Sequence, residues 1–281
     1  MRALITNDDG VSSRGIAVLT RVAVEAGLDV VVAAPHEERS GASAALSGLE
    51  DGGRLRSTRT VVDDLDVDAF AVHASPALIA FVASRGAFGP RPDVVLSGIN
   101  HGPNTGSAVL HSGTVGAALT AVTHGIPGLA VSLAGVDASS LAAVSSRTGD
   151  PSADPGAARP AATSWDTAAD VTARALRWFL DHLDPDRVIN VNVPAVPPSD
   201  LRGIRAARLA TFGAVQAEIG DRDDEFVTVR FDEIHTETDD DSDASLVEHG
   251  WATVTALRPP TAVTVDTSEL ADPADPVDTP D

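Results

Sequence analysis

The chain has 281 residues and a formal net charge of −21, and it contains neither cysteine nor lysine. The absence of lysine excludes a P-loop and Schiff-base chemistry, and the absence of cysteine excludes thiolate zinc sites and cysteine nucleophiles. No apolar run reaches the roughly 18 residues that a membrane-spanning helix needs, and the N-terminus lacks the features of a signal peptide. We therefore expect a soluble, cytoplasmic protein that has no membrane partner.

The negative charge is concentrated toward the C-terminus. Residues 217–281 hold 19 acids and 3 arginines, whereas residues 1–216 hold 22 acids and 17 arginines. An acidic surface without a basic stripe repels a phosphate backbone, which argues against binding to polymeric nucleic acid. A small phosphate ester bound in a cleft is still compatible with this distribution of charge.

Strand and helix patterns alternate through the first half of the sequence. In chain order we expect a strand at 2–6, a helix at 14–26, strands at 29–34, 53–61 and 67–73, a helix from 76 to about 85, a strand at 93–97, a helix from 113 to 124 and a strand at 129–133. This order predicts an α/β fold with a doubly wound, mainly parallel, Rossmann-like sheet. The loops that follow residues 6, 34 and 97 should then converge at one edge of the sheet.

The remaining sequence divides into segments of different composition. We expect residues 1–136 to form an α/β core that binds metal and phosphate, and residues 137–163, rich in Pro, Gly, Ser and Asp, to form a surface loop. Residues 164–200 should complete the core with a helix at 165–183 and a strand at 187–193. Residues 201–260 predict a smaller β-rich C-terminal appendage for oligomerisation, with strands at 203–210, 226–232 and 251–257 and no helix. Residues 261–281 predict a disordered acidic tail.

The segment Asn7-Asp8-Asp9-Gly10, directly after the first strand, is the strongest local signal in the sequence. Two adjacent carboxylates repel each other, and keeping both ionised in a confined cleft is costly unless a cation lies between them. Mg²⁺ or Mn²⁺ would satisfy this requirement. Receiver domains also carry an acidic pair after their first strand, but they depend on a lysine that this chain lacks. The alternative for an isolated Asp-Asp pair is a helix cap.

Two further loops add oxygen ligands and features that suit an anion. One contains Arg39-Ser40-Gly41-Ala42-Ser43, which offers hydroxyl groups and a close backbone approach. The other runs from Ser97 to Gly106 and leads into Ser112-Gly113-Thr114, where the N-terminus of a helix favours a phosphate. Two carboxylates, a hydroxyl and an amide carbonyl from three loops together suit a divalent cation and hydrolysis at phosphorus.

In this order and spacing, the motifs resemble those of the SurE family of survival-protein nucleotidases. The matching segments are 6–10, 39–43, 97–106 and 112–115. The resemblance implies a phosphomonoesterase that acts on nucleoside 5′- and 3′-monophosphates, uses one divalent metal ion per subunit, Mg²⁺ or Mn²⁺, and forms a homodimer or homotetramer. It implies that Asp8, Asp9, Ser40 and Asn100 are the metal ligands, and that Asp8 and Asp9 are catalytic. We further expect phosphate or substrate contacts from Asn7, Gly41, Ser43, Asn104, Ser112, Gly113 and Thr114.

The sequence departs from the family pattern beside these motifs. An acid and a hydroxyl are missing at Ala77 and Leu78, two acids are replaced by Ser107 and Ala108, and His111 replaces an aromatic residue. A second hypothesis is therefore a nucleotide- or phosphate-binding protein that keeps the metal but has weak or no turnover.

Two chemical alternatives concern individual side chains. His101 and His111 are candidates for protonating the leaving oxygen. A haloacid-dehalogenase-type phosphatase is disfavoured, because its paired acids are separated by one residue whereas Asp8 and Asp9 are adjacent.

Overall fold

The computed structural model describes residues 1–135, 162–211, 215–222, 227–233 and 240–265. The strands of its main sheet are β1 (Arg2–Thr6), β2 (Asp29–Pro35), β5 (Ser57–Val62), β6 (Leu65–Val72), β7 (Val94–His101), β8 (Gly128–Leu133), β9 (Val188–Val193), β10 (Gly203–Ala206) and β13 (Trp251–Leu257). Shorter strands are β3 (Leu49–Glu50), β4 (Arg54–Leu55), β11 (Val215–Arg222) and β12 (Val227–Glu233). The helices are α1 (Arg14–Glu25), α2 (Pro76–Ala83), η1 (Gly106–Leu110), α3 (Gly113–Val122), α5 (Ala162–Asp181), η2 (Pro198–Asp200) and α6 (Asp243–Glu248).

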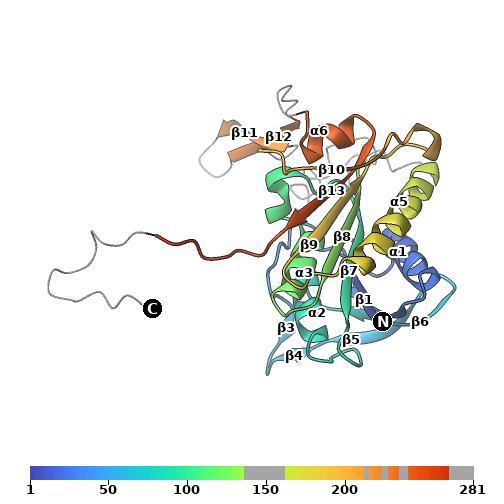
Figure 1. The fold of residues 1–281 in the computed structure, drawn as a ribbon. Helices are drawn as coiled ribbons and strands as arrows, with labels where there is room; N and C mark the ends of the chain where they lie inside the picture. Colours follow the sequence, from blue (N-terminus) through green and yellow to red (C-terminus); the bar gives the residue numbers. More distant parts are fainter. Residues whose placement is uncertain (136–161, 212–214, 223–226, 234–239, 266–281) are drawn as a thin grey trace, which may run out of the picture.

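The main sheet has nine strands in the order β10-β13-β9-β8-β7-β1-β2-β6-β5. Neighbouring strands run parallel except at the pairs β5–β6 and β9–β13. Two small antiparallel sheets, β3–β4 and β11–β12, accompany it. Helices cover both faces, with α1 and α5 on one side and α2 and α3 on the other (Figure 1). The predicted doubly wound, mainly parallel α/β sheet is confirmed.

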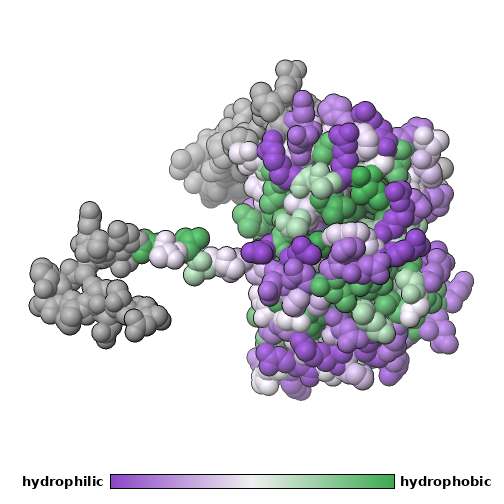
Figure 2. Space-filling model, viewed as in Figure 1, coloured by the Kyte–Doolittle hydropathy of each residue, from purple (hydrophilic) through white to green (hydrophobic). Residues whose placement is uncertain are grey.

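Both faces of the sheet are buried because its central strands are apolar at nearly every position. In β1, Ala3 and Ile5 belong to the hydrophobic cluster that includes α1 and α5, whereas Leu4 belongs to the cluster that includes α2. Strands that are buried on both faces read as continuous apolar runs, which is why the sequence predicts them well. On the face seen in Figure 2, hydrophilic residues are widespread and hydrophobic residues appear as patches between them.

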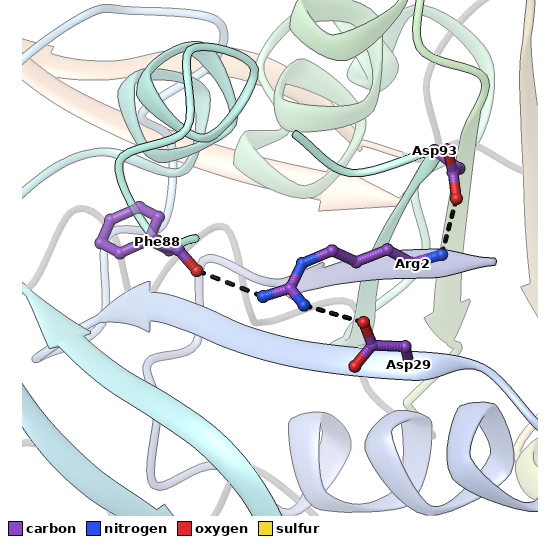
Figure 3. A network of polar contacts seen from close by, with 4 residues as sticks. All are labelled: Arg2, Asp29, Phe88 and Asp93. Carbon is purple, nitrogen blue, oxygen red and sulfur yellow. Dashed lines mark hydrogen bonds and ion pairs between the residues drawn. The ribbon is translucent and has the colours of Figure 1, made fainter. Parts of the chain in front are cut away.

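Arg2 ties the amino ends of the central strands together. Its guanidinium donates to the Asp29 carboxylate at 2.8 Å and to the carbonyl of Phe88 at 3.4 Å (Figure 3). Its backbone N–H donates to the Asp93 carboxylate at 2.7 Å. Because Asp29 begins β2 and Asp93 directly precedes β7, these bonds help to align the two strands that flank β1. The site loops leave the opposite, carboxyl ends of the same strands.

Most elements lie within a few residues of their predicted positions, but the expectation of no helix in residues 201–260 is wrong. Helix α6 spans Asp243–Glu248, and the hydroxyl of Ser242 caps it by accepting a hydrogen bond from the backbone N–H of Ser245. A helix of six residues is too short to show a clear apolar period, so the sequence pattern does not reveal it.

The predicted end of the strand at residue 97 is also wrong. Strand β7 continues to His101, with an irregular register against β8 between Ser97 and Asn100. The glycines in this stretch predict a loop, but the backbone of Gly98 packs closely against the carbonyl of Val131 in β8, where a side chain would not fit. The glycine therefore permits a strand to pass close to its neighbour.

The C-terminal strands have two different positions. Strands β10 and β13 extend the main sheet beyond β9, whereas β11 and β12 pair with each other. Residues 258–265 form no helix or strand and lead away from the sheet (Figure 1). The predicted surface loop lies outside the described residues except for 162–163, and so does the predicted tail from residue 266 onward. No helix in the described ranges is both long and apolar enough to cross a membrane.

Candidate active site

Three loops meet at the carboxyl ends of β1, β2 and β7. The chain passes from β1 outward to β2 and β6, and then returns to β7 on the other side of β1, which makes this edge a topological switch point. The backbone N–H of Arg39 donates to the carbonyl of Asp8 at 2.7 Å, and the backbone N–H of His101 donates to the Asp9 carboxylate at 3.2 Å. The predicted convergence of the loops is confirmed.

Asn7 shapes the turn between β1 and α1. Its buried side-chain amide donates to the carbonyl of Gly10 at 3.0 Å and to the hydroxyl of Ser13 at 2.7 Å. Its side-chain oxygen accepts from the N–H of Gly10 at 3.2 Å. These bonds hold the turn that presents Asp8 and Asp9, while a substrate contact by Asn7 stays a prediction.

Asp8 is buried against the first turn of α3, with 5% of its surface exposed. The hydroxyl of Thr114 donates a hydrogen bond to its carboxylate. A Cβ atom added to Gly113 would lie 2.8 Å from both Cβ and Oδ2 of Asp8, so a larger residue there would displace the carboxylate. Burial raises the pKa of Asp8, although the bond from Thr114 acts in the opposite direction. Burial therefore opposes ionisation of Asp8, and a positive charge nearby would offset this effect.

Asp9 shares this resistance to ionisation. Burial is the largest cause, and together with the charge of Asp8 it raises the pKa of Asp9 to about 8. The charge of Glu38 acts in the same direction, whereas the hydrogen bond from the backbone of His101 opposes it. Two adjacent carboxyl groups with raised pKa values are the arrangement that a bound cation would stabilise.

The second loop lies across the start of α3. A Cβ atom added to Gly116 would come within 2.5 Å of the carbonyl oxygen of Ser43. The hydroxyl of Ser43 donates to the carbonyl of Leu110 at 2.6 Å, at the end of η1. The loop thus packs on the two elements that follow the third loop, close to the N-terminus that was predicted to bind phosphate.

Ser40 lies at an open hollow of about 660 Å³ on this second loop. Its hydroxyl donates its proton to the Glu38 carboxylate at 2.7 Å, which leaves the hydroxyl lone pairs available to a cation. Arg39 pairs with Glu37 at 2.9 Å. The hollow is lined by Glu37, Glu38, Arg39, Ser40, Gly41, Ala42 and Ser47.

Asn100 lies near the end of β7, beside the start of α1. The backbone of Gly15 in α1 packs so closely on the carbonyl of Ile99 that no side chain would fit between them. The side-chain amide of Asn100 donates to the carbonyl of Gly102 at 2.8 Å. This bond fixes the orientation of the amide and turns its oxygen, the atom that can bind a cation, away from that carbonyl.

Asn104 points into the protein, toward β8 and β9. Its side-chain amide donates to the hydroxyl of Ser132 at 2.8 Å, and its backbone N–H donates to the side chain of Asn192 at 2.7 Å. Its carbonyl accepts from the amides of Asn190 and Asn192 at 2.9 and 3.0 Å. The structure therefore gives Asn104 a role in anchoring the third loop, and its predicted substrate contact stays a prediction. Asn190 and Asn192 lie on one face of the buried strand β9, and buried amides require hydrogen-bond partners. This pair is the feature of the sequence that indicates an anchored loop beside β9.

At the start of α3, Ser112 accepts a hydrogen bond from the backbone N–H of Val115 at 3.0 Å and so caps the helix. Gly113 and Thr114 follow it and are buried beside Asp8. The sequence predicts phosphate binding here, which stays a prediction, and the structure places this helix N-terminus directly against the first loop.

The residues that depart from the family pattern lie in different environments. Ala77 and Leu78 are buried in α2, where they pack in the core. Ser107 and His111 are exposed in and after η1, and Ala108 is partly exposed. Only the second group therefore lies at the surface beside the third loop.

Among the described residues, no three His, Cys, Asp or Glu side chains are grouped as they would be around a metal ion. The predicted ligand set contains only two residues of these types, Asp8 and Asp9. Ser40 and Asn100 would complete it with neutral oxygens.

The fold and the site define an α/β protein with a carboxylate pair at the switch point of a parallel sheet. The family model described as "Survival protein SurE" matches residues 3–214. The 5′/3′-nucleotidase SurE of Edwardsiella ictaluri is 37% identical over 224 residues, which cover 79% of this chain and 75% of the relative. The 5′-nucleotidase SurE 1 of Burkholderia lata is 32% identical over 92% of this chain and 90% of the relative.

A solved structure agrees with these matches. The SurE protein from Aquifex aeolicus has a TM-score of 0.69 and 27% sequence identity, over 92% of this chain and 93% of that chain. The chain belongs to the SurE family.

Proposed function

We propose that the chain is a divalent-metal-dependent nucleotidase that hydrolyses nucleoside 5′- and 3′-monophosphates to nucleoside and phosphate. The observation that carries the proposal is the pair Asp8 and Asp9, held at the switch point of the sheet beside a helix N-terminus. Relatives that match most of the chain are named 5′-nucleotidase or 5′/3′-nucleotidase, which supports this reaction. These names do not favour the alternative, a binding protein with weak or no turnover.

The donor set suits one Mg²⁺ or Mn²⁺ ion per subunit. Asp8, Asp9, Ser40 and Asn100 offer hard oxygen atoms from three converging loops, which are the ligands that these ions prefer. Burial raises the pKa values of both carboxyl groups, and the charge of Asp8 further raises that of Asp9. A cation beside them would offset both effects. When bound, such an ion acts as a Lewis acid toward a phosphoryl oxygen.

The protein's own residues would position the substrate. The positive end of the α3 dipole favours a phosphate near this turn, although the backbone N–H groups of Gly113 and Thr114 already bond to Asp8. Gly41 and Ser43 belong to the loop that crosses this turn. Thr114 holds Asp8 beside the helix N-terminus, so a ligand bound there would lie close to both. His101 and His111 are the proposed proton donors to the leaving oxygen, and the backbone of His101 already contacts Asp9.

We also propose that the protein acts in the cytoplasm as a homodimer or homotetramer. Its substrate is a small nucleotide, and it does not bind polymeric nucleic acid. The mass in solution, measured by light scattering, tests the assembly. A monomeric mass would contradict it.

The test of the reaction is phosphate release from a panel of nucleoside 5′- and 3′-monophosphates with Mg²⁺, with Mn²⁺ and with a chelator. We expect activity that depends on metal and falls by about 100-fold or more in Asp8→Asn and in Asp9→Asn, because each removes a charge that the site uses. Equal activity in the wild type and both variants would overturn the proposal. Equilibrium dialysis of the same nucleotides separates an enzyme from a binder: tight binding without product would support the binding protein.

A further inference from the structure

Asp243, in the C-terminal part of the chain, holds the third loop of the candidate site. Its side chain is fully buried, with 0% exposed, and carboxylates are rarely buried without strong partners. Both of its carboxylate oxygens accept from the backbone N–H of Gly106 at 3.1 Å. One oxygen also accepts from the N–H groups of Ala210 and Ala244, each at 2.9 Å. The bond to Gly106 joins positions 137 residues apart in the sequence.

Gly106 is the point where the third loop ends and η1 begins. Its φ angle of 53° lies in the left-handed region, so the chain turns sharply there. The carboxylate of Asp243 fixes the N–H group at this turn. From there, η1 leads through Ser112 into α3, whose first turn contacts Asp8.

The third loop is anchored on both sides of this turn. Asn104 is bonded to side chains of β8 and β9, and Gly106 is bonded to Asp243. Asn100, the proposed ligand at the start of the loop, belongs to β7. The two anchors therefore hold the segment between Asn100 and α3 on both sides of the turn at Gly106.

We propose that Asp243 is a positioning residue of the nucleotidase site, which fixes Gly106 and with it the path of the chain from Asn100 to α3. This inference rests on the proposed function, because it names a support of that site. It gives the segment beyond residue 214, where the match to the family model ends, a part in the geometry of the site. The C-terminal region then completes the site in addition to any part in assembly.

The test compares Asp243→Asn with a matched control, Ser242→Ala. The Asn variant keeps the shape of the side chain but replaces one of the two oxygens that accept from Gly106 with an NH₂ group. It removes the negative charge and places a donor against the N–H of Gly106, so the bond is weakened. The control removes the hydroxyl that caps α6 and accepts from the N–H of Ser245 at 3.3 Å, and it leaves the carboxylate on Gly106 intact. Both changes weaken α6, but only Asp243→Asn weakens the bond that anchors the third loop.

Two measurements separate positioning from general stability. The first is kcat and KM for a nucleoside monophosphate, per folded molecule and well below Tm. The second is hydrogen–deuterium exchange of residues 101–110. We expect Asp243→Asn to lower kcat/KM by about 10- to 100-fold and to speed exchange in this segment, because small misplacements of a site are costly. We expect Ser242→Ala to lower Tm only.

A lower Tm with unchanged kcat/KM and unchanged exchange in Asp243→Asn would overturn the inference, and so would equal losses of activity in both variants. If Asp243→Asn does not fold, hydrogen–deuterium exchange of the wild type still tests the anchor. The amide of Gly106 should be protected, and rapid exchange there would contradict its bond to Asp243. A wild type without activity on any nucleotide would contradict the proposed function. The exchange data would still test the anchor itself.

Discussion

The hydroxyl of Thr114 donates a hydrogen bond to the carboxylate of Asp8 and joins two residues that are 106 positions apart in the sequence. Both side chains are buried, one in the first turn of α3 and the other in the loop after β1. The bond favours the charged form of Asp8, against the larger effect of burial. It also holds the helix N-terminus and the acidic pair in one fixed arrangement.

Replacing Thr114 with valine should therefore lower activity more than stability alone explains. Thr114→Val keeps the shape of the side chain but removes the donor, at a cost of about 1–3 kcal/mol in the free energy of unfolding. We expect kcat/KM per folded molecule to fall by about tenfold or more, because Asp8 loses its orientation. Thr114→Ser keeps the hydroxyl and should retain most of the activity. The role of Thr114 is refuted if the valine variant matches the serine variant.

Gly113→Ala tests the space around Asp8. The added Cβ atom would meet Asp8 at 2.8 Å, which is closer than carbon and oxygen atoms pack, so the carboxylate must move. We expect a loss of about 1–3 kcal/mol in stability and a fall in kcat/KM per folded molecule of about tenfold or more. Ala121→Gly is the control, because it weakens the same helix at a buried position outside its first turn. Comparable activity in the two variants, measured below Tm, would show that the contact is unimportant.

The fold could be predicted because its central strands are continuous apolar runs, and because Ser75 and Ser112 cap α2 and α3 as their sequences indicate. The convergence of the three loops then follows from the topology, since the carboxyl ends of neighbouring parallel strands meet at one edge. The ligand assignments of Ser40 and Asn100 came from the family resemblance, and they stay predictions.

The contacts within the site could not be read from the sequence. Nothing local indicates that Asp243 accepts from Gly106, because the two are 137 residues apart and α6 has only six residues. The glycines near residue 98 predict a loop by their flexibility, yet here glycine makes room for the neighbouring strand. For Asn104 the sequence predicts a substrate contact, which stays a prediction, but it does not indicate the bonds to side chains of β8 and β9.

The raised pKa of Asp9 predicts that the metal-free protein loses stability as the pH rises. Because the pKa is about 8 in the folded state and 3.8 in its ordinary state, the folded protein holds this proton more tightly than the unfolded chain does. The stabilisation from this tighter proton binding is complete below the ordinary pKa of 3.8, and it is lost as the pH rises through the folded-state pKa of about 8. We expect Tm with a chelator to fall between about pH 5 and about pH 9, and less steeply in Asp9→Asn. A Tm that rises over this range in the wild type would contradict the assignment.

Metal binding should release protons, since a cation favours the ionised carboxyl groups. Below about pH 8, where Asp9 is largely protonated, the affinity for Mn²⁺ should rise by about tenfold per pH unit. Calorimetric titration of the chelator-treated protein with Mn²⁺, in two buffers of different ionisation enthalpy, measures the protons released. Binding without proton release at pH 7 would mean that Asp9 is already ionised or is not a ligand.

Glu38 should shift the pH range of this release, although burial and the charge of Asp8 affect the pKa of Asp9 more strongly. Its charge raises the pKa of Asp9, whereas its carboxylate also accepts the hydroxyl proton of Ser40. Glu38→Gln removes the charge and keeps an accepting oxygen, so the pH profile of Mn²⁺ binding should move to lower pH while the hydroxyl stays oriented.

Glu37→Gln is the matched control for this charge. Glu37 lines the same hollow and pairs with Arg39, but it is not among the causes of the raised pKa of Asp9. The Mn²⁺ titrations should therefore show a shifted profile in Glu38→Gln and a wild-type profile in Glu37→Gln. A specific effect of Glu38 requires the two variants to differ. Equal shifts in both would mean that the overall charge of the hollow, rather than Glu38, changes the pKa of Asp9.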